Sequence, residues 1–183
     1  MFAARMWWLL RWMGHEKVAV LDGGLEHWLE CEHTLSQDAV VPVGRQFISN
    51  LREGFVVNAS YVRSALDDSP ALLMDARAND RYLGLNESID PIAGHIPGAV
   101  SVPFMGNLNE RGSFFSSSAL HERYQVLLKR YSIDNCIVYC GSGVTAAHNI
   151  LAMYHAGLGE AKLYAGSWSD WITDPERPVE TGS

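Results

Sequence analysis

The chain of 183 residues is 48% hydrophobic and 19% charged, a composition that is ordinary for a globular protein. Its net charge of −7 argues against a nucleic-acid partner, because binding phosphates requires a surplus of Lys and Arg. No run of 18 apolar residues occurs, which excludes a membrane-spanning helix. The length suits one complete α/β domain with additional residues.

The first predicted element is a helix within Met1–Met13. This segment is apolar enough to resemble a signal peptide, but Arg5 and Arg11 interrupt it and no small-residue cleavage site follows. We therefore interpret the segment as a helix of the fold.

An internal repeat follows from this helix. Residues Ala3–Leu29 align without a gap to Ala146–Ile172, at an offset of 143 positions. In each copy a helix precedes a Gly turn, a short strand and a helix opened by Gly, and such turns need the backbone freedom of glycine. The ungapped alignment of whole elements favours duplication over chance. The identities are Ala3/Ala146, Ala4/Ala147, Gly14/Gly157, Gly23/Gly166 and Trp28/Trp171, and the predicted strands are Val18–Leu21 and Ala161–Tyr164.

The repeat predicts three parts of the chain. Residues 1–35 correspond to the C-terminal part of one module, residues 36–57 to a linker, and residues 58–183 to a complete module. At the same offset, the counterpart of Cys140 would precede Met1. The first module is therefore expected to be truncated at its N-terminal side.

Within residues 58–183 short apolar segments alternate with helical ones. This alternation predicts an α/β fold with a mostly parallel sheet flanked by helices on both faces. Ligands of such folds bind at the carboxyl ends of the strands. The expected helices are Ser60–Leu66, Ser118–Tyr131 with a Ser N-cap, Val144–His155 and one from Ser167, and the expected strands are Ala71–Met74, Ala99–Val102, Cys136–Tyr139 and Ala161–Tyr164.

Three cysteines, an odd number without a framework spacing, favour reduced thiols in a cytoplasmic setting. Cys136 and Cys140 are four residues apart on a predicted strand, which puts their Cα atoms roughly 13 Å apart. A disulfide needs less than about 7 Å, so these two cannot pair. With His148 they also lack the paired spacing of metal ligands, and no metal site is expected.

Cys140 is the candidate nucleophile. An apolar strand delivers it to its carboxyl end, Gly141-Ser142-Gly143 lets the backbone turn tightly, and a helix begins near Val144. Backbone N–H groups and the helix N-terminus at such a turn favour the thiolate over the thiol. A structural role in packing suits Cys31 and Cys136, but a packing cysteine does not need a Gly-x-Gly turn that opens a helix.

This stretch resembles the six-residue active loop of sulfurtransferases of the rhodanese superfamily, in particular of the 3-mercaptopyruvate type. Rhodaneses specific for thiosulfate usually carry basic residues after the cysteine. In this family two rhodanese-like modules are joined in tandem and the second is catalytic. The resemblance extends over nearly the whole chain and rests on the segments Cys140–Thr145, Leu73–Arg77, Gly94–Ala99 and Leu21–Trp28.

The resemblance implies roles for individual residues. Arg81 matches the substrate-binding arginine of the family, and its planar fork suits a carboxylate; the alternative is a solvated surface charge. Ser142 would act with Cys140 in catalysis by donating its hydroxyl or relaying a proton, unless a small residue is simply tolerated there. The remaining substrate-binding candidates are Gly141, Gly143, Val144 and Thr145, the last of which has helix capping as an alternative role.

Other residues of these motifs are expected to be structural. Asp75 and Arg77 would form a pair that fixes the loop beneath the site, and His95 would stabilise a turn. Two departures from the family matter: no second arginine lies between Tyr82 and His95, and the family's His and Asp from the first module have no counterpart. A pocket open on one side and an exposed Trp-rich surface on residues 1–13 would follow.

The favoured function is transfer of sulfur from 3-mercaptopyruvate through a Cys140 persulfide to an acceptor such as cyanide, a small thiol or thioredoxin. No cofactor is implied. Thiosulfate sulfurtransferase activity stays open as an alternative, although a neutral Gly-Ser-Gly loop attracts a dianion less than a basic loop would. A rhodanese-like binding module with impaired catalysis is the third alternative. A cysteine phosphatase is rejected, because its phosphate-binding arginine would fall at Ala146.

Overall fold

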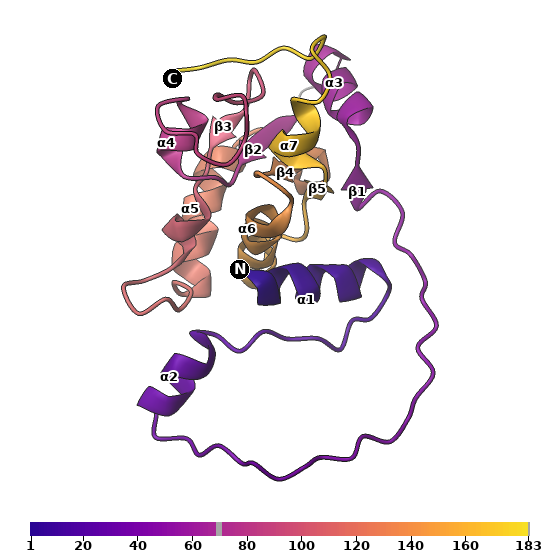
Figure 1. Ribbon diagram of the computed structural model, residues 1–183, viewed down its shortest axis with the longest axis vertical. Helices are drawn as coiled ribbons and strands as arrows, with labels where there is room; N and C mark the ends of the chain where they lie inside the picture. The colour runs from indigo at the N-terminus through magenta and orange to yellow at the C-terminus, as the bar shows by residue number, and fades with distance from the viewer. Residues whose placement is uncertain (69–70, 183) are drawn as a thin grey trace.

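The computed structural model describes residues 1–68 and 71–182 (Figure 1). At its centre lies a five-stranded sheet in the order β1-β5-β4-β2-β3, in which every neighbouring pair runs parallel. The predicted α/β class with a parallel sheet is confirmed. The strands are β1 (Val56–Val57), β2 (Leu72–Asp75), β3 (Val100–Ser101), β4 (Cys136–Tyr139) and β5 (Lys162–Tyr164).

Helices cover both faces of this sheet. The helix Ser117–Leu128, α5, begins one residue earlier than expected, because Ser116 caps it: the Oγ of Ser116 accepts a hydrogen bond from the N–H of Ala119. The helices are α1 (Phe2–Trp12), α2 (Gly24–Glu30), α3 (Ala59–Asp68), α4 (Asn79–Tyr82), α5 (Ser117–Leu128), α6 (Val144–His155) and α7 (Ser167–Trp171), with the 3-10 helices η1 (Phe104–Asn107) and η2 (Ile133–Asn135). None of the helices in the described ranges is both long and apolar enough to cross a lipid bilayer.

The two central strands supply side chains to two separate cores, because successive residues of a strand point to opposite faces of the sheet. Met74 and Val138 lie in the core shared with α1, α5 and α6. Leu73 and Ile137 lie in the core on the other face, together with Trp168 of α7. Every residue of β2 and β4 is buried, as is typical of parallel strands covered on both sides.

The N-terminal helix α1 packs against α6 (Figure 1). Trp7 and Trp8 are only 2% and 1% exposed, so the expectation of an exposed Trp-rich surface is wrong. Burying two indole rings against α6 removes a large apolar area from water, which stabilises this contact. Arg11 adds a two-pronged ion pair, in which Nε and Nη2 bind the carboxylate of Glu160 at 2.9 and 2.6 Å.

The predicted strand Val18–Leu21 is not formed. Its counterpart in the repeat, β5, pairs with β1 on one side and β4 on the other. No strand within the described residues pairs with Val18–Leu21. A strand exists only through hydrogen bonds to a neighbour, so this prediction is wrong for lack of a partner. Figure 1 shows the chain after α2 continuing as a long loop that reaches β1.

The helices of the two repeat copies nevertheless end alike. Gly14 follows α1 with φ +86°, and Gly157 follows α6 with φ +73°. In both places the residue after the glycine donates its N–H to a carbonyl of the last helical turn. A left-handed glycine is a common way to satisfy carbonyl groups at the end of a helix.

Candidate active site

Cys140 follows directly on the last residue of β4, and α6 begins four residues later at Val144. The turn between them depends on Gly143, which has φ +76°, a conformation that L side chains rarely adopt. A Cβ atom on Gly143 would also lie 2.7 Å from the carbonyl oxygen of Ala165. The tight turn that the sequence predicts therefore requires glycine at this position for two reasons.

The backbone around Cys140 is held by the start of α7. The N–H of Cys140 donates to Oγ of Ser167 at 3.1 Å, and its carbonyl oxygen accepts from the N–H of Trp168 at 2.9 Å. The carbonyl oxygen of Gly141 accepts from the N–H of Ser169 at 3.0 Å and lies 2.8 Å from the hydroxyl oxygen of the same residue. These contacts fix the position of the loop relative to the sheet, and hence the position of the thiol.

A cavity of about 380 Å³ opens beside this loop. Six of the residues that sequence analysis assigned to the site line it: Arg81, Cys140, Gly141, Ser142, Val144 and Thr145. Gly143 does not line it, but shapes the loop through the contact described above. The other lining residues are Met1, Phe2, Arg77, Ala78, Ile89, Asp90, Phe104 and Ser169.

The thiol itself is well shielded, since Cys140 is 2% exposed and is not in a disulfide. Ser142, by contrast, is exposed at the rim. Within residues 1–68 and 71–182, no N–H group lies in hydrogen-bonding geometry to the Cys140 sulfur, so the ring of amides around it stays a prediction.

Arg81 lies in the cavity wall, and its charge is already paired with carboxylates. Its Nε and Nη2 bind the carboxylate of Glu87 at 2.9–3.2 Å, and Nη2 also binds Asp90 at 2.9 Å. Burial tends to raise the pKa of Glu87, but hydrogen bonds from the backbone of Ile89 and Asp90 and from Arg81 outweigh it, so this pKa is lowered. Arg81 thus faces two carboxylates for its single charge, which sequence analysis did not anticipate.

Asp75 and Arg77 form the buried pair that the sequence predicts. Nη2 of Arg77 lies 2.6 Å from Oδ2 of Asp75 and also donates to the carbonyl oxygen of Gly94. Burial alone would lower the pKa of Arg77, but the hydrogen bonds and charge of Asp75 raise it overall, so the guanidinium is charged. His95 is structural too, since its ring stacks on the ring of Tyr82 with 3.8 Å between the two ring centroids.

Arg5 is the site residue that sequence analysis missed. It lies on α1, and its Nη1 donates to the carbonyl oxygen of Gly143 at 3.4 Å. Its guanidinium also lies 5.0 Å from the ring of Trp8. Burial lowers the pKa of Arg5, and the electrostatic interaction with Cys140 partly offsets this effect. A basic residue that interrupts an apolar helix was the available signal, but the helix was assigned to the non-catalytic module.

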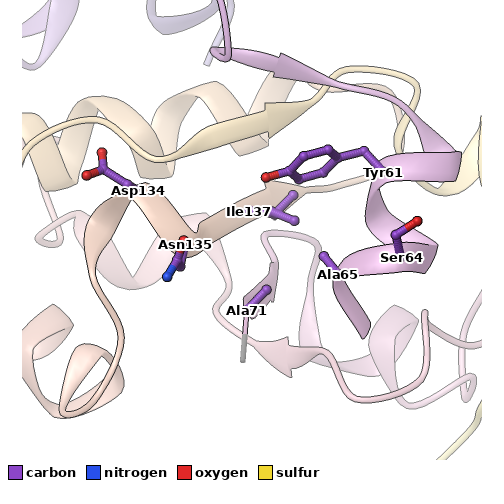
Figure 2. Close-up of a pocket in the computed structure, with 7 residues that line it drawn as sticks. All are labelled: Tyr61, Ser64, Ala65, Ala71, Asp134, Asn135 and Ile137. Carbon is purple, nitrogen blue, oxygen red and sulfur yellow. The ribbon is translucent and has the colours of Figure 1, made fainter. Parts of the chain in front are cut away.

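A second cavity lies away from this chemistry (Figure 2). Its volume is about 230 Å³, and Ile137, near the start of β4, lies between Tyr61 of α3 and Asn135 of η2 in the view. Because Cys140 follows the other end of β4, the two cavities are at opposite ends of the strand. Within the described residues, no group of three or more His, Cys, Asp or Glu side chains could hold a metal ion.

Several known proteins are similar to this chain. The family model of the rhodanese-like domain matches residues 58–174. The chain is 44% identical over 182 residues to a probable 3-mercaptopyruvate sulfurtransferase of Pseudomonas aeruginosa. It is 34% identical over 187 residues to the human 3-mercaptopyruvate sulfurtransferase and 35% identical over 187 residues to the thiosulfate sulfurtransferase of Rattus norvegicus. These alignments cover 98–99% of the chain but only 62–64% of each relative.

A solved structure shares the fold. The anaerobic ergothioneine biosynthesis enzyme from Chlorobium limicola, in complex with trimethyl histidine, superposes with a TM-score of 0.82 at 24% identity. The match covers 98% of this chain and 45% of that one. Residues 58–174, which the family model matches, include β2, β4 and the Cys140 loop. From the family model and the fold together, this chain belongs to the rhodanese family.

Proposed function

We propose that the chain is a sulfurtransferase that moves sulfur from 3-mercaptopyruvate to an acceptor through a persulfide on Cys140. The observation that carries the proposal is the position of Cys140: it follows a buried strand, precedes the helix α6 by a four-residue turn and lines a cavity of about 380 Å³. Strand ends of parallel sheets are where ligands of α/β folds bind. Relatives that are named 3-mercaptopyruvate sulfurtransferases, at 44% and 34% identity, support the donor.

The reaction needs no cofactor, because the donor and the Cys140 thiolate together supply all of its atoms and electrons. The Cys140 thiolate attacks the donor sulfur, an S–S bond forms and the C–S bond of mercaptopyruvate breaks. The electron pair of that bond leaves with carbon as the enolate of pyruvate, which takes up the proton of the donor thiol. The Cys140 persulfide then passes its outer sulfur to an acceptor, for which we propose a small thiol, cyanide or thioredoxin in the reducing cytoplasm.

Each residue around Cys140 would have a separate role in the reaction. Arg5 places positive charge near the sulfur and stabilises the anionic forms of both thiolate and persulfide. Ser142 at the rim would donate its hydroxyl to the donor carbonyl or relay the proton. Arg81 would bind the carboxylate, and Gly141, Gly143, Val144 and Thr145 would shape the surface against which the donor rests.

Thiosulfate is the second candidate donor, because relatives named thiosulfate sulfurtransferase match at similar identity. The charges around the cavity disfavour it. The loop after Cys140 is neutral, and Arg81 is paired with Glu87 and Asp90. The carboxylates of Glu87 and Asp90 would repel a dianion more strongly than the monoanion mercaptopyruvate.

Intact-protein mass spectrometry tests the proposal. Incubation with 3-mercaptopyruvate should add one sulfur atom to the wild type and to Cys136→Ala, but none to Cys140→Ser. Cys136 is the matched control, since it is a buried cysteine of β4, the strand that leads to Cys140. Pyruvate should appear in equal amount, and thiosulfate should load the protein more slowly. No added sulfur on the wild type would reject catalysis and favour a binding module.

A further inference from the structure

Asp90 is a carboxylate inside the proposed donor cavity. It lines the cavity together with Cys140, and its side chain is only 7% exposed. Its two oxygens have different partners: Oδ2 binds Nη2 of Arg81 at 2.9 Å, and Oδ1 accepts from the hydroxyl of Ser169 at 2.7 Å. A negative charge is therefore already bound at the cation that a substrate carboxylate would seek.

The bond to Ser169 ties this carboxylate to the loop that carries the thiol. Ser169 also donates its backbone N–H to the carbonyl oxygen of Gly141, next to Cys140, and its hydroxyl oxygen lies 2.8 Å from that carbonyl oxygen. Asp90 thus connects Arg81 of α4 with Ser169 of α7 through hydrogen bonds. Fixed from both sides, it cannot move away from the cavity without breaking a hydrogen bond.

An incoming anion can reach only one edge of the Arg81 guanidinium group, and it must compete for that edge. Its Nε–Nη2 edge is taken by Glu87, which is 3% exposed and is also 3.5 Å from Nη1 of Arg77. The other edge, Nη1 and Nη2, is shared with Asp90 and lies beside the loop, since a Cβ on Gly141 would be 3.6 Å from Nη1. A bidentate carboxylate would bind at this second edge.

We propose that Asp90 is a specificity-determining residue, an internal anion that occupies the carboxylate position on Arg81 and that the donor has to displace. The inference rests on the proposed function, because it assumes that an anionic donor enters this cavity. Repulsion by Asp90 weakens the binding of every anion, and it weakens a dianion more than a monoanion. Asp90 would thereby set a high KM and favour mercaptopyruvate over thiosulfate.

Removing the charge of Asp90 tests this role. Asp90→Asn keeps an oxygen that accepts from Ser169 and should lower the KM for mercaptopyruvate about tenfold, with kcat nearly unchanged. The KM for thiosulfate should fall by more, so the preference between donors narrows. Asp90→Glu retains the charge and should keep the KM close to that of the wild type. A carboxylate that only supported the fold would give the opposite result, a higher KM or a lower kcat.

Two control variants separate charge from contact. Ser169→Ala removes the hydrogen bond but leaves the Asp90 charge, and should change the KM by less than Asp90→Asn does. Glu110→Gln makes the same change in net charge at an exposed position that does not line the cavity, and should leave the KM unchanged. An equal effect of all three substitutions would overturn the proposal.

Binding of pyruvate gives a readout that does not depend on sulfur transfer. Pyruvate carries the same carboxylate, and calorimetric titration should show tighter binding to Asp90→Asn than to the wild type, with the gain reduced at high salt. If sulfur loading fails but this difference appears, the proposed function is wrong and the role of Asp90 stands. Equal affinity, or no binding to either protein, overturns the role of Asp90 even where sulfur loading succeeds.

Discussion

The hydroxyl of Ser167 accepts a hydrogen bond from the backbone N–H of Cys140 at 3.1 Å and donates one to the carbonyl oxygen of Tyr164 at 2.8 Å. Ser167 is fully buried and has φ +58°, a left-handed conformation that is uncommon for residues with a side chain. The backbone strain is tolerated because the hydroxyl connects the ends of β4 and β5. The candidate nucleophile is thus held by a residue 27 positions further along the chain.

Ser167→Ala should destabilise the fold by about 1–3 kcal/mol, because it leaves the buried N–H of Cys140 without an acceptor. Urea unfolding followed by circular dichroism measures this change. Ser64→Ala is the control, since the hydroxyl of Ser64 bonds a carbonyl on the exposed side of α3, and its cost should stay within about 0.5 kcal/mol. Equal losses in the two variants would show that the Ser167 hydroxyl has no special role.

Gly143 and Gly157 form a matched pair for testing the loop. Both have positive φ, +76° and +73°, but nothing lies within 4 Å of a Cβ on Gly157. Gly157→Ala should cost about 1 kcal/mol of stability through backbone strain alone. Gly143→Ala should cost about 3 kcal/mol, because the new methyl group also meets the carbonyl of Ala165. Thermal unfolding of the two variants makes the comparison, and equal costs would contradict the contact.

Arg5→Gln should slow formation of the Cys140 persulfide about tenfold, since it removes a positive charge beside the reacting sulfur and tenfold corresponds to about 1.4 kcal/mol. Single-turnover mass spectrometry measures this rate. Arg5→Lys keeps the charge and should recover part of the loss. Arg45→Gln, which removes an exposed charge of the loop before β1, should react at the wild-type rate. A normal rate in Arg5→Gln would exclude the electrostatic role.

His148 makes stability depend on pH. Burial lowers the pKa of His148 to about 4, below the value of about 6.5 expected in the unfolded chain. Between these values the unfolded state takes up a proton that the folded state does not, so stability falls as the pH decreases from about 6.5 to about 4. The slope from this group is about 1.4 kcal/mol per pH unit. Urea unfolding of wild type and His148→Phe at several pH values should show a shallower slope for the variant; identical slopes would refute the assignment.

Local sequence predicted the elements that carry the nucleophile. The bounds of β4 and α6 agree with the prediction, because an apolar run followed by Gly-Ser-Gly specifies both ends through neighbouring residues alone. The same reasoning failed for Val18–Leu21, whose apolar pattern is that of a strand but which has no partner among the described strands. It also missed β1, whose two residues become a strand only by pairing with β5.

The charges of the site could not be predicted from the sequence. Position along the chain identified Arg81, but its pairing with Glu87 and Asp90 depends on how the loop after α4 folds back. Arg5 contacts the Cys140 loop from a distance of 138 residues along the chain. Such contacts follow from tertiary packing, which no local pattern encodes.

The packing of α1 on α6 has a consequence for biosynthesis. The ribosome produces α1 before the Cys140 loop, and the Cys140 loop before Ser167 of α7. A growing chain therefore contains Cys140 before its backbone is anchored and before the cavity walls have met. The thiol gains its proposed environment only when α1 and α7 have both packed around the loop, so a chain that still lacks α7 would carry an ordinary cysteine in place of a sulfur carrier.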